Sequence, residues 1–148
     1  MPKIKAKEAF CLGCKLCEIH CIVAHSRSKK ILKAYTHERD EITPRIYVED
    51  AGRVSFAVQC RHCEEAHCIE SCITGAMHRD PETGAVLCDT DKCVGCYMCV
   101  MVCPAGAVMR SRRGKVVSKC DLCAESGVPA CVENCPNEAL IYEEDDES

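Results

Sequence analysis

Four blocks of four cysteines constrain the fold of this chain more than any other feature. Block one reads Cys11-Leu-Gly-Cys14-Lys-Leu-Cys17-Glu-Ile-His-Cys21, and block three reads Cys93-Val-Gly-Cys96-Tyr-Met-Cys99-Val-Met-Val-Cys103-Pro104. In both blocks the cysteines are separated by two, two and three residues. Three thiols at this spacing can converge within one tight loop, while the fourth can point to a different site.

The other two blocks keep the first and last gaps and widen the middle one. Block two comprises Cys60, Cys63, Cys68 and Cys72, with a middle gap of four residues. Block four comprises Cys120, Cys123, Cys131 and Cys135, with a middle gap of seven residues that includes Gly127 and Pro129. The chain therefore repeats one design four times.

The spacing of blocks one and three indicates cubane iron–sulfur clusters. A C-x2-C-x2-C-x3-C-P run supplies three thiolates to one cluster and a fourth to the other cluster of a pair. Gly13 and Gly95 allow the backbone to approach inorganic sulfide, where a Cβ would crowd it. We expect a short helix to begin at the fourth cysteine, with Pro104 in its first turn.

Composition supports a metal-stabilised fold. The 148 residues include 17 cysteines but no Trp and only two Phe, so a conventional core is thin. Residues 1–10 carry three lysines and no apolar stretch typical of a signal peptide. No apolar run approaches the ~20 residues of a membrane helix. We expect a cytoplasmic protein without a transmembrane segment, although export on a partner's signal stays open.

The charge argues against nucleic-acid binding. The formal net charge is −4 with neutral thiols. Four clusters with their thiolates would bring it to about −12, which repels phosphate. The sequence also lacks a glycine-rich phosphate loop and a nucleophile paired with a base, so we expect no catalytic site.

The segments between the blocks predict short elements. Residues 45–49 and 54–58 alternate like strands around a turn, which predicts a β-hairpin. Residues 85–89 and 115–118 predict short strands, residues 111–114 a turn and residues 35–43 a loop. Cys72, Cys103 and Cys135 each begin a similar exit, for which we expect a short helix, a small residue and a strand.

The arrangement resembles the four-cluster ferredoxin-like electron-transfer subunits of formate dehydrogenases, hydrogenases and DMSO-reductase-type enzymes. The stretches Cys21-Ile-Val-Ala-His-Ser, Gln59-Cys-Arg-His-Cys, Gly75-Ala-Met-His-Arg-Asp and Ser118-Lys-Cys-Asp-Leu-Cys are more similar to one branch. That branch is the CooF-type iron–sulfur subunit of carbon monoxide dehydrogenase systems.

The resemblance implies a nested ligand scheme for four [4Fe-4S] clusters. Blocks one and four would share two clusters, and blocks two and three the other two. The implied ligands are Cys11, Cys14, Cys17 and Cys135 for cluster one; Cys21, Cys120, Cys123 and Cys131 for cluster two; Cys60, Cys63, Cys68 and Cys103 for cluster three; and Cys72, Cys93, Cys96 and Cys99 for cluster four. Spacing alone indicates only that each fourth cysteine crosses to another cluster.

The implied fold is α+β, with two ferredoxin-like bicluster modules and a β-hairpin insertion. Residues 1–53 and 111–142 would form the outer module, residues 54–110 the inner module, and residues 143–148 an acidic disordered tail. The implied function is electron relay between a catalytic redox subunit and a hydrogenase or flavin or NAD(P) reductase. Carbon monoxide dehydrogenase is the favoured catalytic partner. A formate dehydrogenase, hydrogenase or aldehyde oxidoreductase partner, or a freely diffusing polyferredoxin, is the alternative.

Several residues allow a plainer interpretation. Sixteen thiols could bind four structural zinc ions instead. The seventeenth cysteine, Cys88, is expected to be a small buried hydrophobe rather than a ligand. His20, His62 and His67 lie inside blocks but are expected at the surface or hydrogen-bonded near cluster sulfur. The basic segments 27–33 and 110–115 are either solvated loops or docking surfaces for an acidic partner.

Overall fold

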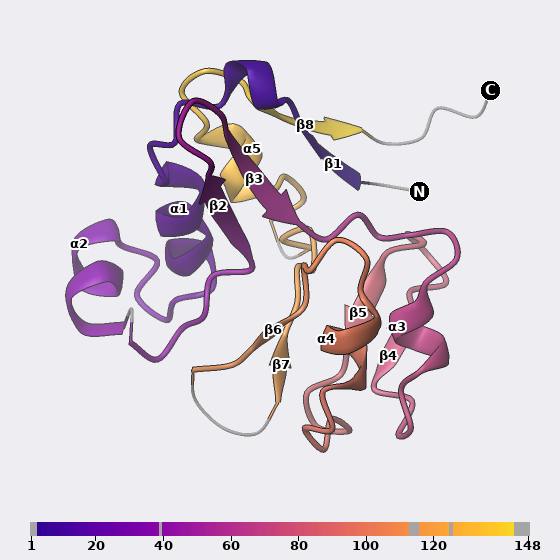
Figure 1. Ribbon diagram of the computed structural model, residues 1–148. Coiled ribbons are helices and arrows are strands. Elements are labelled where there is room, and N and C mark those ends of the chain that lie inside the picture. Colours follow the sequence, from indigo (N-terminus) through magenta and orange to yellow (C-terminus); the bar gives the residue numbers. More distant parts are fainter. Residues whose placement is uncertain (1–2, 39, 113–115, 125, 144–148) are drawn as a thin grey trace.

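The computed structural model describes residues 3–38, 40–112, 116–124 and 126–143. Short helices and four separate two-stranded antiparallel sheets make up this part of the chain, a mixed α and β architecture (Figure 1). The strands are β1 Lys3–Ala6, β2 Ile46–Asp50, β3 Ser55–Gln59, β4 Met77–Arg79, β5 Val86–Cys88, β6 Met109–Arg110, β7 Val117–Ser118 and β8 Leu140–Glu143. The helices are η1 Glu8–Phe10, α1 Leu16–Ala24, α2 Ile31–Lys33, η2 Ala34–Glu38, α3 His67–Glu70, α4 Met98–Val102 and α5 Ala130–Glu133.

The two ends of the described chain form one sheet. β1 pairs with β8, and Ile4 lies opposite Tyr142. The amide of Lys7 extends this pairing by donating to the carbonyl of Ala139 at 2.7 Å. The sequence did not predict β1, because the three lysines in residues 1–10 are not typical of a strand. Its partner strand also lies at the other end of the chain.

The predicted hairpin is present as β2 and β3, with Ile46 paired to Gln59 and Asp50 to Ser55. Its alternating residues present Ile46 and Ala57 to the interior, as the strand pattern requires. The loop predicted over residues 35–43 is wrong in part, because η2 occupies Ala34–Glu38. Ala34, the first residue of η2, is fully buried, so η2 packs against the rest of the protein through this residue.

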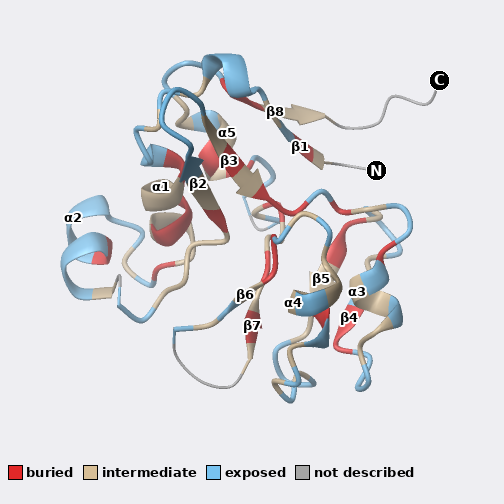
Figure 2. Cartoon of the chain, in the orientation of Figure 1, coloured by how far each residue is buried: buried red, intermediate tan, exposed pale blue. Residues whose placement is uncertain are grey.

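The buried hydrophobic side chains form two clusters, which we call cores; Figure 2 shows buried ribbon at α1 and β3 and at β4, β5 and β7. The first core joins both chain ends to the hairpin. Its members are Ile4, Cys17, Cys21, Ile46, Ala57, Ala85, Leu122, Cys131 and Leu140. The second core is smaller. Its members are Met77, Cys99, Val108 and Val117.

We call the region around the first core the outer half and the region around the second core the inner half. α1 packs against α5 in the outer half, and α3 packs against α4 in the inner half. The expected module boundaries at residues 53/54 and 110/111 each fall between two paired strands. Ala57 joins the outer core and Val117 the inner core, so the packing keeps each hairpin with one half.

In blocks two, three and four a short helix ends before the fourth cysteine, and in block one α1 runs through it, so the expectation that a helix begins there is wrong. α4 ends at Val102, and Cys103 is extended at φ −69° and ψ 114°. Cys103 precedes Pro104, and a residue before proline is pushed out of the helical region. α3 and α5 likewise end at Glu70 and Glu133, before Cys72 and Cys135. In block three the proline therefore ends the helix instead of starting it.

The remaining expectations fall partly outside the described residues. The turn expected at residues 111–114 and the start of the strand at 115–118 include residues 113–115, and β7 begins at Val117. Of the expected acidic tail, the structure describes only Glu143, which ends β8 and forms an ion pair with Lys5 at 2.7 Å. Within the described chain, no helix is both long and apolar enough to cross a membrane.

Candidate metal centres

Four cavities in the structure are each lined by four block cysteines. Cys11, Cys14, Cys17 and Cys135 line the first, and Cys21, Cys120, Cys123 and Cys131 the second. Cys60, Cys63, Cys68 and Cys103 line the third, and Cys72, Cys93, Cys96 and Cys99 the fourth. Each cavity takes three thiols from one block and one from another. We call these sets quartets one to four. Four thiols around a small apolar cavity match the donor set of a cubane cluster.

One backbone conformation recurs directly before the second cysteine of all four blocks. Gly13 and Gly95 have φ values of 68° and 74° there. His62 and Leu122 occupy the equivalent positions with φ values of 44° and 59°. A left-handed conformation costs a non-glycine residue about 1 kcal/mol, so these two positions are strained. The sequence predicted this turn only in blocks one and three, which have a glycine there. The structure shows the same turn in all four blocks.

Backbone amides donate to the cysteine sulfurs. The N–H of Ala107 donates to Cys103 Sγ at 3.4 Å, and the N–H of Ala139 donates to Cys135 Sγ at 3.3 Å. In both cases the donor lies four residues after the cysteine in the sequence. The N–H of Met77 donates to Cys72 Sγ at 3.5 Å. Such bonds stabilise a thiolate and raise the potential of a cluster bound to it.

Cys21 departs from this pattern. α1 continues past it to Ala24, so no backbone amide of the residues directly after it donates to its sulfur within the described chain. Its amide donor is instead Arg45, at 3.2 Å, from the start of the hairpin. The long segment after block one therefore supplies the contact that a tight turn supplies to Cys103 and Cys135.

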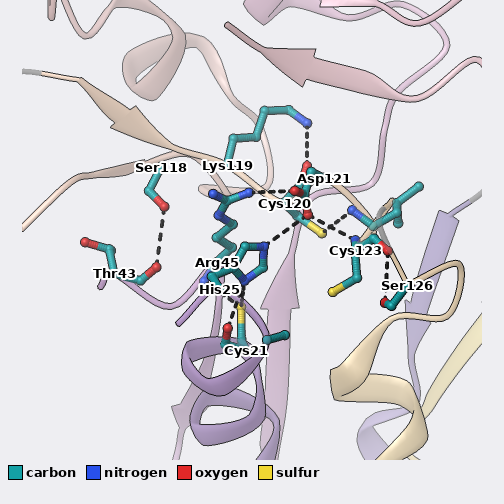
Figure 3. Close-up of polar contacts among 12 residues, drawn as sticks. Cys21, His25, Thr43, Arg45, Ser118, Lys119, Cys120, Asp121, Cys123 and Ser126 are labelled. Carbon is teal, nitrogen blue, oxygen red and sulfur yellow. Dashed lines mark hydrogen bonds and ion pairs between the residues drawn. The ribbon is translucent and has the colours of Figure 1, made fainter. Parts of the chain in front are cut away.

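A charged network surrounds Cys21 (Figure 3). His25 Nδ1 lies 2.8 Å from the carbonyl oxygen of Cys21, and His25 Nε2 lies 3.2 Å from Asp121 Oδ1. Arg45 pairs with Asp121 at 3.0 Å. Burial alone would lower the pKa of His25, but the hydrogen bonds to Asp121 and Cys21 raise it to about 9. The sequence analysis found no role for His25, and this network fixes it beside quartet two.

Burial raises the pKa of several quartet thiols. The pKa of Cys17 and of Cys120 rises to about 12, and that of Cys99 to about 11. These thiols are therefore protonated at neutral pH in the metal-free chain. Metal binding must release their protons, and the positive metal then offsets the cost of burying the thiolates.

The expectation that Cys88 is buried is wrong, because its side chain is only half-buried. It lies at the end of β5 and lines the fourth cavity together with quartet four. Burial and the neighbouring cysteines raise its pKa to about 12. Its position in an alternating strand predicted a side chain in the interior. In the structure that side chain lines the wall of the fourth cavity instead.

The block histidines differ from one another. His67 is exposed and lies 3.7 Å from Glu70, and His20 is half-buried. His62 is almost fully buried, and its Nδ1 accepts the N–H of Val86 at 3.0 Å. Burial first, and then the charge of Lys119, lower the pKa of His62 to about 3, so its ring is neutral. The hydrogen bond from Val86 to His62 links block two to β5.

Comparison with known proteins places the chain in a family. Residues 53–145 match the 4Fe-4S dicluster domain family. The electron transport protein HydN of Escherichia coli is 36% identical over 155 residues, covering 93% of this chain and 85% of that protein. The putative oxidoreductase AegA of E. coli is 41% identical, but this chain spans only 21% of its length. The chain thus belongs to the 4Fe-4S dicluster, ferredoxin-type family of electron-transfer subunits.

A solved structure shows a related fold. The active-site complex BamBC of benzoyl coenzyme A reductase contains a chain with a TM-score of 0.53 and 19% identity. The match covers 97% of this chain and 79% of that one. Membership of this family identifies the chain as an electron-transfer iron–sulfur protein. These similarities do not single out one branch of the family.

Proposed function

We propose that this protein holds four [4Fe-4S] clusters and relays single electrons from a carbon monoxide dehydrogenase to a hydrogenase or a flavin or NAD(P) reductase. The observation that carries the proposal is the set of four cavities, each lined by four cysteines from two blocks. The nested ligand scheme and the two bicluster modules are part of the proposal. The branch-like stretches around Cys21, Cys60 and Cys120 motivate the choice of partner.

The proposed protein has no catalytic site of its own. A cluster, when bound, stores and passes one electron at a time. The chain holds each cluster with four thiolates, which leaves no open iron position for a substrate. Its amides and buried charges set the cluster potentials. We further propose a cytoplasmic location, where thiols stay reduced before metal is inserted.

Docking of the redox partner is proposed at a basic surface, because the holo charge near −12 would repel an acidic partner at long range. Segment 27–33 lies around α2, at the outer half (Figure 1). Of segment 110–115, only Arg110, Ser111 and Arg112 are described, and Arg110 lies over the Tyr97 ring at 5.0 Å. Tyr97 is next to Cys96 of quartet four, so this surface borders a proposed cluster.

The first test is metal content. The anaerobically purified or reconstituted chain should hold about sixteen iron and sixteen sulfide. Eight irons would halve the number of clusters, and stoichiometric zinc would replace the proposal with a structural zinc protein.

The partner is tested by anaerobic reduction with purified carbon monoxide dehydrogenase and carbon monoxide. The clusters should be reduced, as followed by loss of visible absorbance. If they stay oxidised while a formate dehydrogenase or hydrogenase reduces them, carbon monoxide dehydrogenase is the wrong partner. The similarity to HydN, an electron transport protein whose length this chain nearly spans, is compatible with another redox partner or with a freely diffusing polyferredoxin.

A further inference from the structure

Lys119 lies where the two halves of the molecule meet. Its side chain is only 4% exposed. Its ammonium donates to the carbonyl of Val86 in β5. It also donates to the carbonyl of Cys120 at 3.2 Å (Figure 3). Val86 is itself fully buried. The ammonium is therefore held between backbone groups of two distant segments and cannot swing into solvent.

The charge of Lys119 is not balanced by a carboxylate. In the described ranges, no Asp or Glu oxygen lies within ion-pair distance of its ammonium. Asp121, two residues along the chain, pairs instead with His25 and Arg45. A buried ammonium is costly unless negative charge compensates it. Two neutral carbonyls supply only part of that compensation, so a further negative group is expected nearby.

Two thiol quartets lie beside this ammonium. Lys119 lines the cavity of quartet three, together with Cys60 and Cys68. The next residue in the chain is Cys120, a member of quartet two. The ammonium donates to the carbonyl of Cys120 at 3.2 Å, so the positive charge lies beside quartet two as well as quartet three.

Quartets two and three also approach each other closely. Gln59, next to Cys60, lines the cavity of quartet two. An electron that passes from the outer half to the inner half would therefore cross between these two sites, past Lys119. We call the clusters proposed there the junction clusters.

We propose that Lys119 is the fixed positive charge that raises the reduction potentials of the junction clusters. The inference rests on the proposed function and extends it. Each [4Fe-4S]2+ cluster accepts one electron to become [4Fe-4S]1+, without forming or breaking a bond. With four thiolates its charge changes from −2 to −3, so a nearby ammonium stabilises the reduced form more than the oxidised form. The reductant is the partner redox enzyme, or dithionite in the test below.

The test is an anaerobic potentiometric titration of the fully loaded chain with dithionite, followed by electron paramagnetic resonance. Lys119→Gln removes the charge and keeps a hydrogen-bond donor, and Lys119→Met removes both the charge and the donor from a side chain of similar length. At a fixed potential, the ratio of reduced to oxidised cluster should fall about tenfold at one or both junction clusters. For a one-electron couple this is about 59 mV. The other two clusters should keep their midpoints.

Two further variants separate charge from shape. Lys119→Arg keeps the charge and should stay close to the wild-type midpoints. Lys15→Gln is the matched control, because Lys15 also lies next to a quartet cysteine, Cys14, but is exposed. Water screens its charge, so its effect on every midpoint should be less than twofold in the same ratio.

The outcomes decide the role of Lys119. Loaded Lys119→Gln or Lys119→Met protein with four unchanged midpoints would overturn the inference, as would an equal shift at all four clusters or an equal shift in Lys15→Gln. If both neutral variants lose iron while Lys119→Arg keeps it, charge compensation by Lys119 is supported. Loss of iron in all three variants would assign a purely structural role and overturn it.

The inference and the proposed function can fail separately. A wild-type chain that holds iron but is not reduced by carbon monoxide dehydrogenase contradicts only the partner. A wild-type chain that holds no iron contradicts both.

Discussion

The outer and inner halves each surround two thiol quartets, but protein side chains stabilise them unequally. The outer core contains four large aliphatic residues, Ile4, Ile46, Leu122 and Leu140. The inner core has only Met77, Val108 and Val117 besides its cysteine. The outer half is also closed by the pairing of both chain ends. Fewer buried aliphatic groups mean less hydrophobic stabilisation, so the inner half depends more on metal.

The largest expected effect comes from removing the metal. Anaerobic chelation should abolish most tertiary structure, with the inner half affected more. Hydrogen–deuterium exchange followed by mass spectrometry should show peptides of residues 77–110 exchanging at unfolded rates, while peptides from α1 and β8 keep partial protection. A metal-free chain with native-like circular dichroism and cooperative melting would contradict the dependence on metal. Equal protection in both halves would contradict the difference between them.

A smaller effect is expected from removing single ligands. Cys103→Ala should release about four irons and expose Cys60, Cys63 and Cys68, because quartet three takes its fourth thiol from block three. Anaerobic alkylation and peptide mapping would identify the newly reactive thiols. Labelling of Cys93, Cys96 and Cys99 instead would show that block three keeps its own fourth ligand.

Two variants control this experiment. Cys135→Ala should expose Cys11, Cys14 and Cys17 in the outer half by the same logic. Cys88→Ser should keep all iron, although Cys88 lines the cavity of quartet four. Iron loss in Cys88→Ser would make Cys88 a ligand.

Local patterns in the sequence predicted short-range structure better than long-range structure. The hairpin was predictable because alternating residues 45–58 carry a local signal. β1 was not, since its partner strand lies more than a hundred residues away. The helix ends were misjudged because Pro104 acts on the residue before it. Local sequence patterns thus predict strands that pair with a neighbour in the sequence. They do not predict the pairing of β1 with β8, whose residues are far apart in the sequence.

The residues around the quartets were harder to predict than the cysteines. Lys119 reads as an ordinary polar residue between a strand and a cysteine, and its burial depends on Val86, 33 residues earlier. His25 acquires its partners only when Asp121 approaches from block four. Both positions depend on the meeting of distant segments. A recurring motif marks the ligands, and nothing local marks the residues that fold around them.

The smallest effect concerns one position shared by the two halves. Lys15 and Tyr97 each follow the second cysteine of a block and precede a helix, with φ values of 62° and 59°. Glycine would relieve the left-handed strain at both positions. Lys15 is exposed, so Lys15→Gly should stabilise the outer half by about 0.5 kcal/mol, after the entropy of the unfolded glycine is counted.

The same substitution should have the opposite sign at Tyr97. Its ring packs against the inner core and lies 5.0 Å from the Arg110 guanidinium. Tyr97→Gly forfeits that packing and the cation–π contact, which outweigh the relieved strain and cost about 1–2 kcal/mol. The measurement is the guanidinium concentration at which cluster absorbance is half lost. Tyr97→Phe, which keeps the ring, should stay near wild type. If Tyr97→Gly matched Lys15→Gly in sign, backbone strain rather than side-chain packing would dominate here, and the inner core would matter less than its composition indicates.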